Sequence, residues 1–332
     1  MPTSGFSTGL INAEQIMATG PEHIRLDHDP RYAHGSAYID GVYTDIDHAA
    51  IPITDMGFLQ ADACYDVVSV TKGQFFRLDD HLERFEQSCA KFRLRNPLSR
   101  TETAAMLTRL VQLAGTQSAY VWWAVTRGEM PDKGSERGNP AAYRNRMYAF
   151  VVPFIFIADD EQRRKGLDIA VSEKYIRIPA NAVDPTAKNF HGMDTRQALF
   201  DATDRKANWC VLCNDEGLLT EAPGANIFVL KNGELFTPRS GCLEGITRKT
   251  VMELAAELKI KASLIDMHAD FLRDADEAFV TSTAGGVMPI RTVDGKVIGN
   301  DSNPITTQLH NLYWEKRWNG WLCTPIDYAA GV

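Results

Sequence analysis

A lysine and a glutamate stand in two segments whose residue types could act on one ligand. Lys188 lies in the run Asp184-Pro-Thr-Ala-Lys-Asn189, just before a stretch whose apolar spacing predicts a helix over residues 191–206. Glu221 lies in the run Leu219-Thr-Glu-Ala-Pro-Gly-Ala-Asn-Ile-Phe228, between two strand-like stretches. An amine and a carboxylate at the ends of such elements can face one ligand from two sides. A surface lysine and a hairpin glutamate would explain the same residues, so the rest of the chain must decide.

Two further segments contain groups that bind phosphate. Arg84 lies on a predicted helix and offers a planar fork of donors that suits phosphate. The run Gly241-Cys-Leu-Glu-Gly-Ile-Thr-Arg248 leads directly into another predicted helix, so the free amides of Ile246 and Thr247 would point at an anion. A surface arginine and an ordinary capped helix are the structural alternatives.

A third segment, Thr281-Ser-Thr-Ala-Gly-Gly-Val287, ends a predicted strand with hydroxyls and two glycines. Ser282 and Thr283 could donate to an anion there, and the glycines allow close backbone approach. The segment is not a Walker loop, because no Gly-Lys-Ser/Thr follows. A lysine, a carboxylate and a phosphate clamp together are what pyridoxal 5'-phosphate (PLP) requires: an amine for the Schiff base, an acceptor that keeps the ring nitrogen protonated, and an anchor.

Composition excludes several other classes of protein. The net charge of −8 gives no electrostatic reason to bind nucleic acid. No apolar run reaches the roughly 18 to 20 residues that a membrane span needs, and the first residues lack the form of a signal or transit peptide. Six scattered cysteines are typical of a reducing compartment. We therefore expect a cytoplasmic protein that acts on small molecules.

The sequence also predicts no metal site. Cys210 and Cys213 have the spacing of half a zinc site, but no second pair follows at the spacing that zinc requires. The stretch around them is apolar enough to be a buried strand.

The elements that must position these residues mix strands and helices without regular βαβ alternation, which predicts an α+β fold. The length of 332 residues predicts two domains after an N-terminal arm over 1–34: a smaller α+β domain over 35–157 and a larger one over 158–332 that contains Lys188. The expected elements are hairpin turns at Asp40-Gly41, Lys72-Gly73 and Asp294-Gly295, a helix over 81–92 capped by Asp79 or Asp80, helices over 101–114, 191–206, 246–258 and 305–318, and strands that include 118–127, 147–157, 209–213 and 226–237.

Taken together, the motifs resemble those of the fold-type IV PLP-dependent aminotransferases, the family of the branched-chain and D-amino-acid enzymes. The lysine, glutamate, Gly241–Arg248 and Thr281–Val287 segments match its signatures in order, as does Phe76-Arg-Leu-Asp-Asp-His-Leu-Glu-Arg84. The match spans about residues 35 to 320. Within the family the chain looks most similar to the (R)-selective amine transaminases, on Asp55-Met-Gly-Phe, Tyr65-Asp-Val, the aromatic strand at Tyr120 and Tyr313-Trp-Glu.

The resemblance implies a role for each site residue. Lys188 would form the Schiff base and carry the proton, and Glu221 would pair with the pyridine nitrogen. Phosphate would be held by Arg84, Ile246, Thr247, Ser282 and Thr283. Substrate would be bound by Gln60, Tyr65, Val67, Tyr120, Arg137, Gly192 and Ala284. Members of the family are homodimers, which implies a homodimer here.

Three departures from the family pattern concern the substrate. This chain has Gln60-Ala61 where related amine transaminases have histidine and serine, Gly192 where they usually have tryptophan, and Met193 where branched-chain enzymes have tyrosine. Small residues at Ala61 and Gly192 predict a wider pocket. In the polar loop 128–143, Arg137 or Lys133 is expected to bind the carboxylate of a keto acid.

These observations predict an (R)-selective amine transaminase that moves an amino group from a chiral primary amine to a keto acid such as pyruvate in a ping-pong reaction. The alternatives on the same fold are a D-amino-acid or branched-chain aminotransferase and an aminodeoxychorismate-lyase-like enzyme. A protein that holds PLP without turnover is the alternative outside the enzymes.

Overall fold

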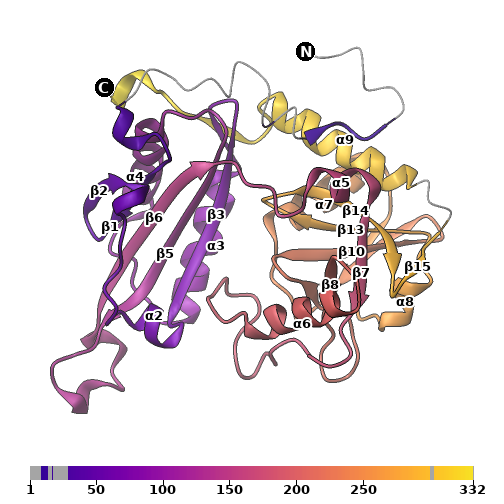
Figure 1. Cartoon of the computed structure of the whole chain (residues 1–332), viewed down its shortest axis with the longest axis horizontal. Helices are drawn as coiled ribbons and strands as arrows, with labels where there is room; N and C mark the ends of the chain where they lie inside the picture. Colours follow the sequence, from indigo (N-terminus) through magenta and orange to yellow (C-terminus); the bar gives the residue numbers. More distant parts are fainter. Residues whose placement is uncertain (1–8, 14–16, 18–28, 300–302, 332) are drawn as a thin grey trace. The chain divides into compact units, whose positions relative to one another are not determined.

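The computed structural model describes residues 9–13, 17, 29–299 and 303–331 of the chain. They form two compact units, which are treated separately (Figure 1). Unit 1 comprises Phe156–Thr186, Gly192–Lys316 and the described part of Met1–Ala13; unit 2 comprises the described part of Glu14–Ile155, Ala187–His191 and Arg317–Val332. The expected arm over 1–34 lies largely outside the described residues. The expected domain limits of 35–157 and 158–332 stay a prediction, since a compact unit is not by itself a folding domain.

Unit 2 contains a sheet of seven strands in the order β16-β4-β3-β5-β6-β1-β2, and every neighbouring pair is antiparallel. Hairpins at Asp40-Gly41 and Lys72-Gly73 join β1 to β2 and β3 to β4, as the sequence predicts, and all four residues have positive φ. The strands are β1 (Ser36–Ile39), β2 (Val42–Asp45), β3 (Ala63–Thr71), β4 (Gln74–Phe76), β5 (Ala119–Glu129), β6 (Arg144–Pro153) and β16 (Cys323–Pro325).

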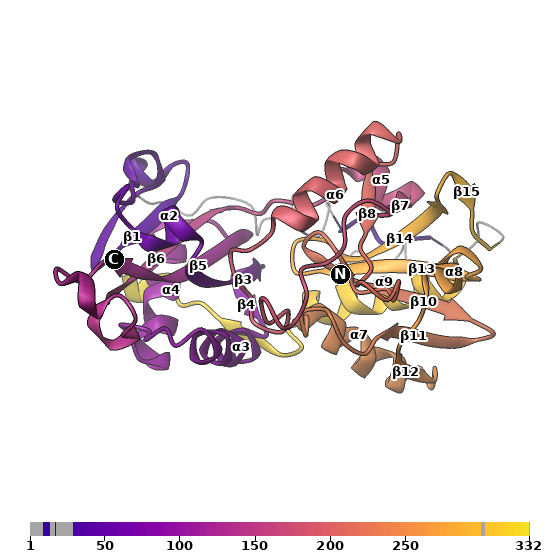
Figure 2. The same cartoon turned by 90° about the horizontal axis from the view of Figure 1, so that it is seen from below.

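Two helices, α3 (Leu78–Lys91) and α4 (Arg100–Ala114), cover one face of this sheet (Figure 2). Alternate strand residues such as Val68, Val121 and Trp123 pack there against Phe85 of α3 and Leu107 of α4. Because side chains alternate along a strand, the residues between them, including Tyr65 and Val67, are on the opposite face. A short helix, α2 (Met56–Gln60), precedes β3 and begins with Asp55 as its cap.

Unit 1 is built on a sheet of nine strands in which β12-β11-β10-β13-β14-β7-β8 are neighbours, with β9 paired to β10 and β15 to β14. Antiparallel pairs form its centre, while β11–β12, β14–β7 and β7–β8 are parallel. The strands are β7 (Leu167–Val171), β8 (Trp209–Val211), β9 (Glu221–Ala222), β10 (Ala225–Lys231), β11 (Glu234–Pro238), β12 (Ala262–Ile265), β13 (Glu277–Ser282), β14 (Gly286–Val293) and β15 (Lys296–Val297). Two mixed units of this kind confirm the predicted α+β class.

The helices of unit 1 pack on this sheet through small or apolar faces. Ala198 and Ala202 of α6 (Met193–Asp204) lie against β7 and β8. In α9 (Pro304–Trp318), Tyr313 and Trp314 lie so close to Gly286 that a Cβ there would contact both rings. The others are α5 (Asp160–Lys165), α7 (Ile246–Glu257) and α8 (Ala269–Arg273). Among the described residues, no helix is both long enough and apolar enough to cross a membrane.

Three expected elements differ from the structure. The strand expected over 226–237 is a hairpin of β10 and β11 that turns at Asn232-Gly233, where both residues have positive φ. The helix expected over 81–92 begins at Leu78, and its N-cap is Arg77 in a left-handed conformation rather than Asp79 or Asp80, which lie in the first turn. Asp80 instead accepts a hydrogen bond from Nε of Arg77 at 2.5 Å. The strand expected over 147–157 runs from Arg144 to Pro153, because β6 follows its partner β5 into the base of the polar loop.

Candidate active site

The predicted site residues fall into two sets, one in each unit. In unit 2, the segment around Lys188 is held to β3 and α3 by its backbone. The N–H of Lys188 donates to Oγ of Ser88 at 3.0 Å, and its carbonyl accepts from the N–H of Tyr65 at 3.0 Å. Ser88 is fixed in turn by donating to the carbonyl of Arg84. The main chain at the lysine is therefore tied to two elements, while its side chain is half-buried.

An aromatic ring lies beside the lysine side chain in unit 2, and further aromatic rings pack against that ring. Nζ of Lys188 lies 4.4 Å from the centroid of the Tyr65 ring, which suits an ammonium group. The Tyr65 ring packs on Trp122 and Phe190 at centroid distances of 6.0 and 5.7 Å. We call the set Tyr65, Tyr120, Trp122, Phe150 and Phe190 the aromatic wall, since each ring contacts another member.

Val67 and Tyr120, both expected to line a substrate pocket, come from neighbouring strands of the same sheet. Val67 is opposite Trp122 in the β3–β5 register, and Tyr120 is opposite Ser69. Burial raises the pKa of Tyr120, so its hydroxyl stays protonated at neutral pH. The unit therefore brings the predicted lysine and the aromatic substrate residues to one region of β3 and β5.

Arg84 is anchored by a buried carboxylate. Its Nε and one Nη donate to Asp66 at 2.8 and 2.6 Å, and Nδ1 of His81 lies 2.8 Å from the same carboxylate. Asp66 is fully buried. Burial alone would raise the pKa of Asp66, but Arg84 and His81 outweigh it and hold that pKa well below its usual range. Burial also lowers the pKa of His81, which is neutral at pH 7. We call these three residues the Asp66 cluster.

In unit 1, Glu221 lies at the joined ends of three strands. It is opposite Asn226 of β10, and Asn226 is opposite Thr281 of β13. Oε1 of Glu221 accepts from Nε of Arg177 at 2.9 Å, and Oε2 accepts from the N–H of Leu243 at 3.0 Å. The carboxylate is 8% exposed as a residue and held on both oxygens.

The predicted phosphate residues of unit 1 gather at the same strand ends. Helix α7 begins at Ile246 with Gly245 as its N-cap, so no side chain caps the amides of its first turn. A Cβ at Gly245 would collide with the amide oxygen of Asn226, so this position requires glycine. Ser282 ends β13, and the buried hydroxyl of its neighbour Thr281 has no hydrogen-bond partner within the described part of the chain. Uncapped amides and hydroxyls beside a carboxylate fit the phosphate and ring nitrogen of PLP.

The remaining predicted residues lie in more open positions. Gln60 and Arg137 are exposed, as is Lys133, and Ala61 ends α2 in a left-handed conformation. Gly192 is the N-cap of α6, and a Cβ there would meet only Oγ1 of Thr195, at 3.6 Å. The backbone of Ala284 accepts a hydrogen bond from Ile157 at 2.8 Å.

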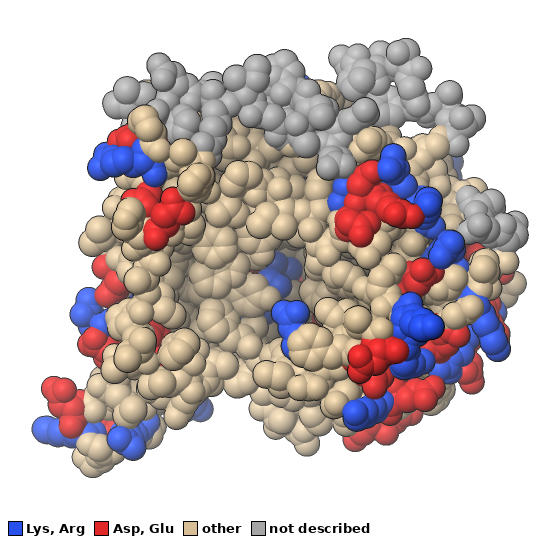
Figure 3. All heavy atoms as spheres, in the orientation of Figure 1, with Lys and Arg blue, Asp and Glu red and all other residues tan. Residues whose placement is uncertain are grey.

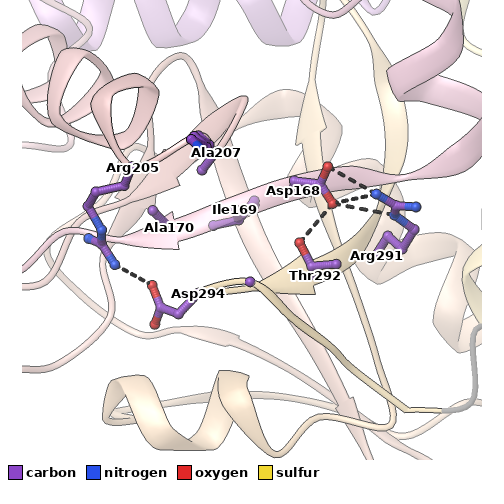
Figure 4. A pocket seen from close by; sticks show the side chains of 10 residues that line it. Asp168, Ile169, Ala170, Arg205, Ala207, Arg291, Thr292 and Asp294 are labelled. Carbon is purple, nitrogen blue, oxygen red and sulfur yellow. Dashed lines mark hydrogen bonds and ion pairs between the residues drawn. The ribbon is translucent and has the colours of Figure 1, made fainter.

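A surface pocket of unit 1, about 340 Å³ in volume, contains none of these residues (Figure 4). Four of its charged side chains are paired: Arg291 binds Asp168, which also accepts from Thr292, and Arg205 binds Asp294. Such paired groups leave little for a ligand. Acidic and basic side chains also lie intermixed on the face drawn in Figure 3, without the basic patch that nucleic acid would need.

Among the described residues, no three His, Cys, Asp or Glu side chains come together as metal ligands. Cys210 and Cys213 are both buried, and burial raises the pKa of Cys210 to about 12, so its thiol stays protonated at neutral pH.

Sequence reasoning missed Asp66 and Arg177. Asp66 could have been found from the sequence, because it is a carboxylate in an otherwise apolar strand. Side chains alternate along a strand, so Asp66 lies on the face toward the helices and needs partners there. Arg177 had none, because it stands in an irregular segment and its partners, Asp194 and Glu221, are 17 and 44 residues away.

Comparisons with known proteins identify the class to which this chain belongs. A family described as "Amino-transferase class IV" matches residues 63–293. The chain belongs to this family, whose fold-type IV enzymes depend on PLP, and it is a PLP-dependent aminotransferase.

Known relatives have two substrate classes in their names. A branched-chain-amino-acid aminotransferase of Pseudomonas aeruginosa is 31% identical over 265 residues, 78% of this chain and 83% of that protein. A D-alanine aminotransferase of Listeria innocua is 28% identical over 296 residues, 85% of this chain and 95% of that protein. The Thermobaculum terrenum branched-chain aminotransferase in its PLP form superposes with a TM-score of 0.78 at 22% identity, over 89% of this chain and 99% of that one, and shows the shared fold.

Proposed function

We propose that this aminotransferase is an (R)-selective amine transaminase, which takes an amino group from a chiral primary amine and gives it to a keto acid such as pyruvate. The supporting observation is the aromatic wall beside Lys188. An apolar, aromatic surface next to the reactive amine favours an aryl or alkyl amine over a donor that carries a carboxylate. A D-amino-acid or branched-chain donor is the second candidate, supported by the names of the relatives.

We propose further that the predicted residues of each unit bind PLP. Lys188 would hold the cofactor, Glu221 its ring nitrogen, and the remaining donors its phosphate: Arg84, Ile246, Thr247, Ser282 and Thr283. When bound, PLP supplies an electron sink that makes the proton on the substrate carbon removable. Lys188 would move that proton as a general base. Tyr65, Val67 and Tyr120, with Gln60, Gly192 and Ala284, would contact the substrate.

A homodimer is part of this proposal. In unit 2, the segment 51–59 leaves Ile53, Phe58 and Leu59 at 76%, 63% and 53% exposure. A cluster of large apolar side chains in water is typical of a surface that a partner covers. Sedimentation should give twice the mass of 37.0 kDa, and Phe58→Glu should weaken that association. We also infer a cytoplasmic location, supported by the six cysteines, all free thiols.

The deciding experiment is a visible spectrum of the purified holoenzyme before and after each enantiomer of 1-phenylethylamine is added. The proposal expects the cofactor band to bleach with the (R)-amine and to return with pyruvate, with little change from the (S)-amine. Bleaching by D-alanine or L-leucine but by neither amine would establish the second candidate instead. A band that no donor bleaches would exclude both, and release of pyruvate without amino transfer would indicate a lyase.

A further inference from the structure

Arg177 joins two carboxylates in unit 1, and the proposed function gives it no role. It lies in the segment between β7 and α6 and is 8% exposed. Its Nε donates to Oε1 of Glu221 at 2.9 Å, and its Nη1 donates to Oδ2 of Asp194 at 2.6 Å. A planar guanidinium has donors at fixed angles, so it sets the direction of both carboxylates.

Backbone hydrogen bonds also hold the segment that contains Arg177 in place. Its N–H donates to the carbonyl of Cys213 at 2.8 Å, which ties the segment to the end of β8. Asp194 accepts a second hydrogen bond from the N–H of Ile178 at 2.7 Å and lies in the first turn of α6, where a helix favours negative charge. The arginine therefore reaches Glu221 from a fixed base.

We propose that Arg177 is the positioning residue for Glu221, which it orients and keeps ionised. This inference rests on the proposed role of Glu221 at the pyridine nitrogen. Glu221 reaches that nitrogen as an anion only while a cation balances its charge in a buried place. Leu243 holds the second oxygen through a neutral N–H, and Arg177 supplies a positive charge at the first oxygen.

Electrostatics gives the direction of the effect. Burial opposes the charge on Arg177, but the carboxylates of Glu221 and Asp194 outweigh burial and raise its pKa above the ordinary value. Without that cation, two largely buried carboxylates would remain near each other. Desolvation and mutual repulsion would then favour protonation of one of them, and a protonated Glu221 no longer balances a protonated ring nitrogen.

The test compares Arg177→Met with wild-type holoenzyme. We expect the acid limb of the pH profile of kcat/KM, and the pH dependence of the visible cofactor band, to move upward by about one pH unit or more. PLP itself should dissociate with about a tenfold larger Kd, measured by equilibrium dialysis. The loss should appear in kcat more than in KM. Arg177→Lys keeps the charge but not the fork, so it should recover part of each change.

Two controls separate positioning from simple support. Asp194→Asn removes the other partner of Arg177 but leaves the Arg177–Glu221 pair, so the acid limb of the pH profile should stay in place. A shift as large as that of Arg177→Met would show that Arg177 only ties its segment to α6, and this result would overturn the inference. Arg163→Met removes another buried arginine of unit 1 and should lower thermal stability without moving the profile; a moved profile there would also count against the inference.

Glu221→Gln distinguishes failure of the inference from failure of the proposed function. If Glu221→Gln changes rate and spectrum while Arg177→Met leaves profile, Kd and spectrum unchanged, the inference is wrong and the function stands. If Glu221→Gln itself changes neither rate nor spectrum, the proposed role of Glu221 is wrong. In a Glu221→Gln background, Arg177→Met should add no further pH shift. If Arg177→Met does not fold, the same measurements on Arg177→Lys decide the question. We then expect a smaller upward shift of the acid limb of the pH profile, and an unchanged profile would overturn the inference.

Discussion

Each unit of this protein contains one buried arginine–carboxylate group at its proposed functional residues, and the two groups are built differently. In unit 2, Asp66 is 0% exposed and is held by His81 and by two donors of Arg84. In unit 1, Glu221 keeps 8% exposure and shares its arginine with Asp194. The first carboxylate is enclosed by its own sheet and helix, whereas the second lies at strand ends.

The difference indicates that burial decides what such a pair can do. A fully enclosed carboxylate can orient its neighbours, here Arg84 and α3, but cannot reach a ligand. A carboxylate at the end of β9 can be oriented by an arginine and still be offered to a cofactor. The Asp66 cluster is therefore expected to act mainly on stability and on the position of Arg84, and Glu221 mainly on the rate.

The largest effect is expected for Lys188→Ala, which removes the residue proposed to hold the cofactor. Transamination should fall by more than about 1,000-fold, because the lysine both holds the cofactor and moves the proton. The melting temperature of the apo protein should change little, since the bonds of Lys188 to Ser88 and Tyr65 are made by its backbone. Turnover close to wild type in single-turnover assays would contradict the assignment.

Glu221→Gln should reduce kcat by about 100-fold, on the order of 3 kcal/mol, because an amide does not keep the ring nitrogen protonated. PLP should still bind, which absorbance of the dialysed protein would establish. Because Glu221 is less enclosed than Asp66, the free energy of unfolding should change less in Glu221→Gln than in Asp66→Asn. An unchanged rate would mean that the ring nitrogen has another partner.

Asp66→Asn should lower the free energy of unfolding by about 3 to 5 kcal/mol, because it leaves Arg84 buried without its anion. Denaturant titration of the apo protein measures this. Asp62→Asn is a matched control in the same unit, since Asp62 pairs with Arg127 but is 30% exposed in its side chain, and a smaller loss is expected. Equal losses in the two variants would contradict the view that enclosure makes Asp66 special.

The acid stability of the protein tests His81. Its pKa is lowered by burial, so the folded protein leaves it neutral where the unfolded chain takes up a proton. The free energy of unfolding should therefore fall as pH drops below about 6.5, by at most about 1.4 kcal/mol per pH unit for this group. His81→Gln should flatten that slope between pH 6.5 and 5, whereas His34→Gln, at an exposed residue, should keep it. A slope unchanged in His81→Gln would contradict this role.

The smallest effect is expected for Gly192→Trp, which alters neither charged group. The site has room for a Cβ and has φ of −143°, so stability should change by less than about 0.5 kcal/mol. If Gly192 lines the substrate pocket, the rate ratio of ethyl- to methyl-bearing (R)-aryl amines should fall about tenfold, since overpacking costs roughly 1 to 3 kcal/mol. An identical ratio in both proteins would show that this position does not set the pocket.

The class of fold, most helices and the two key motifs could be predicted from the sequence, because they depend on local spacing. Apolar periodicity set α4 and α7 to within a residue at each end, and Asp-Gly and Lys-Gly pairs set two hairpins. The start of α3 could not be predicted in this way, because Arg77 takes a left-handed conformation and the two acidic residues that resemble caps lie inside the helix.

Lys188, Glu221 and the amides of Ile246 and Thr247 could be proposed as site residues from the sequence alone, because each stands in a short motif. Only the tertiary structure decided which charges meet. Asp66 contacts Arg84 across 18 residues and Arg177 contacts Glu221 across 44. These contacts depend on how a helix and an irregular segment pack against strands, which no local pattern contains. The sequence determined which groups can react, and burial and register determined which groups hold them.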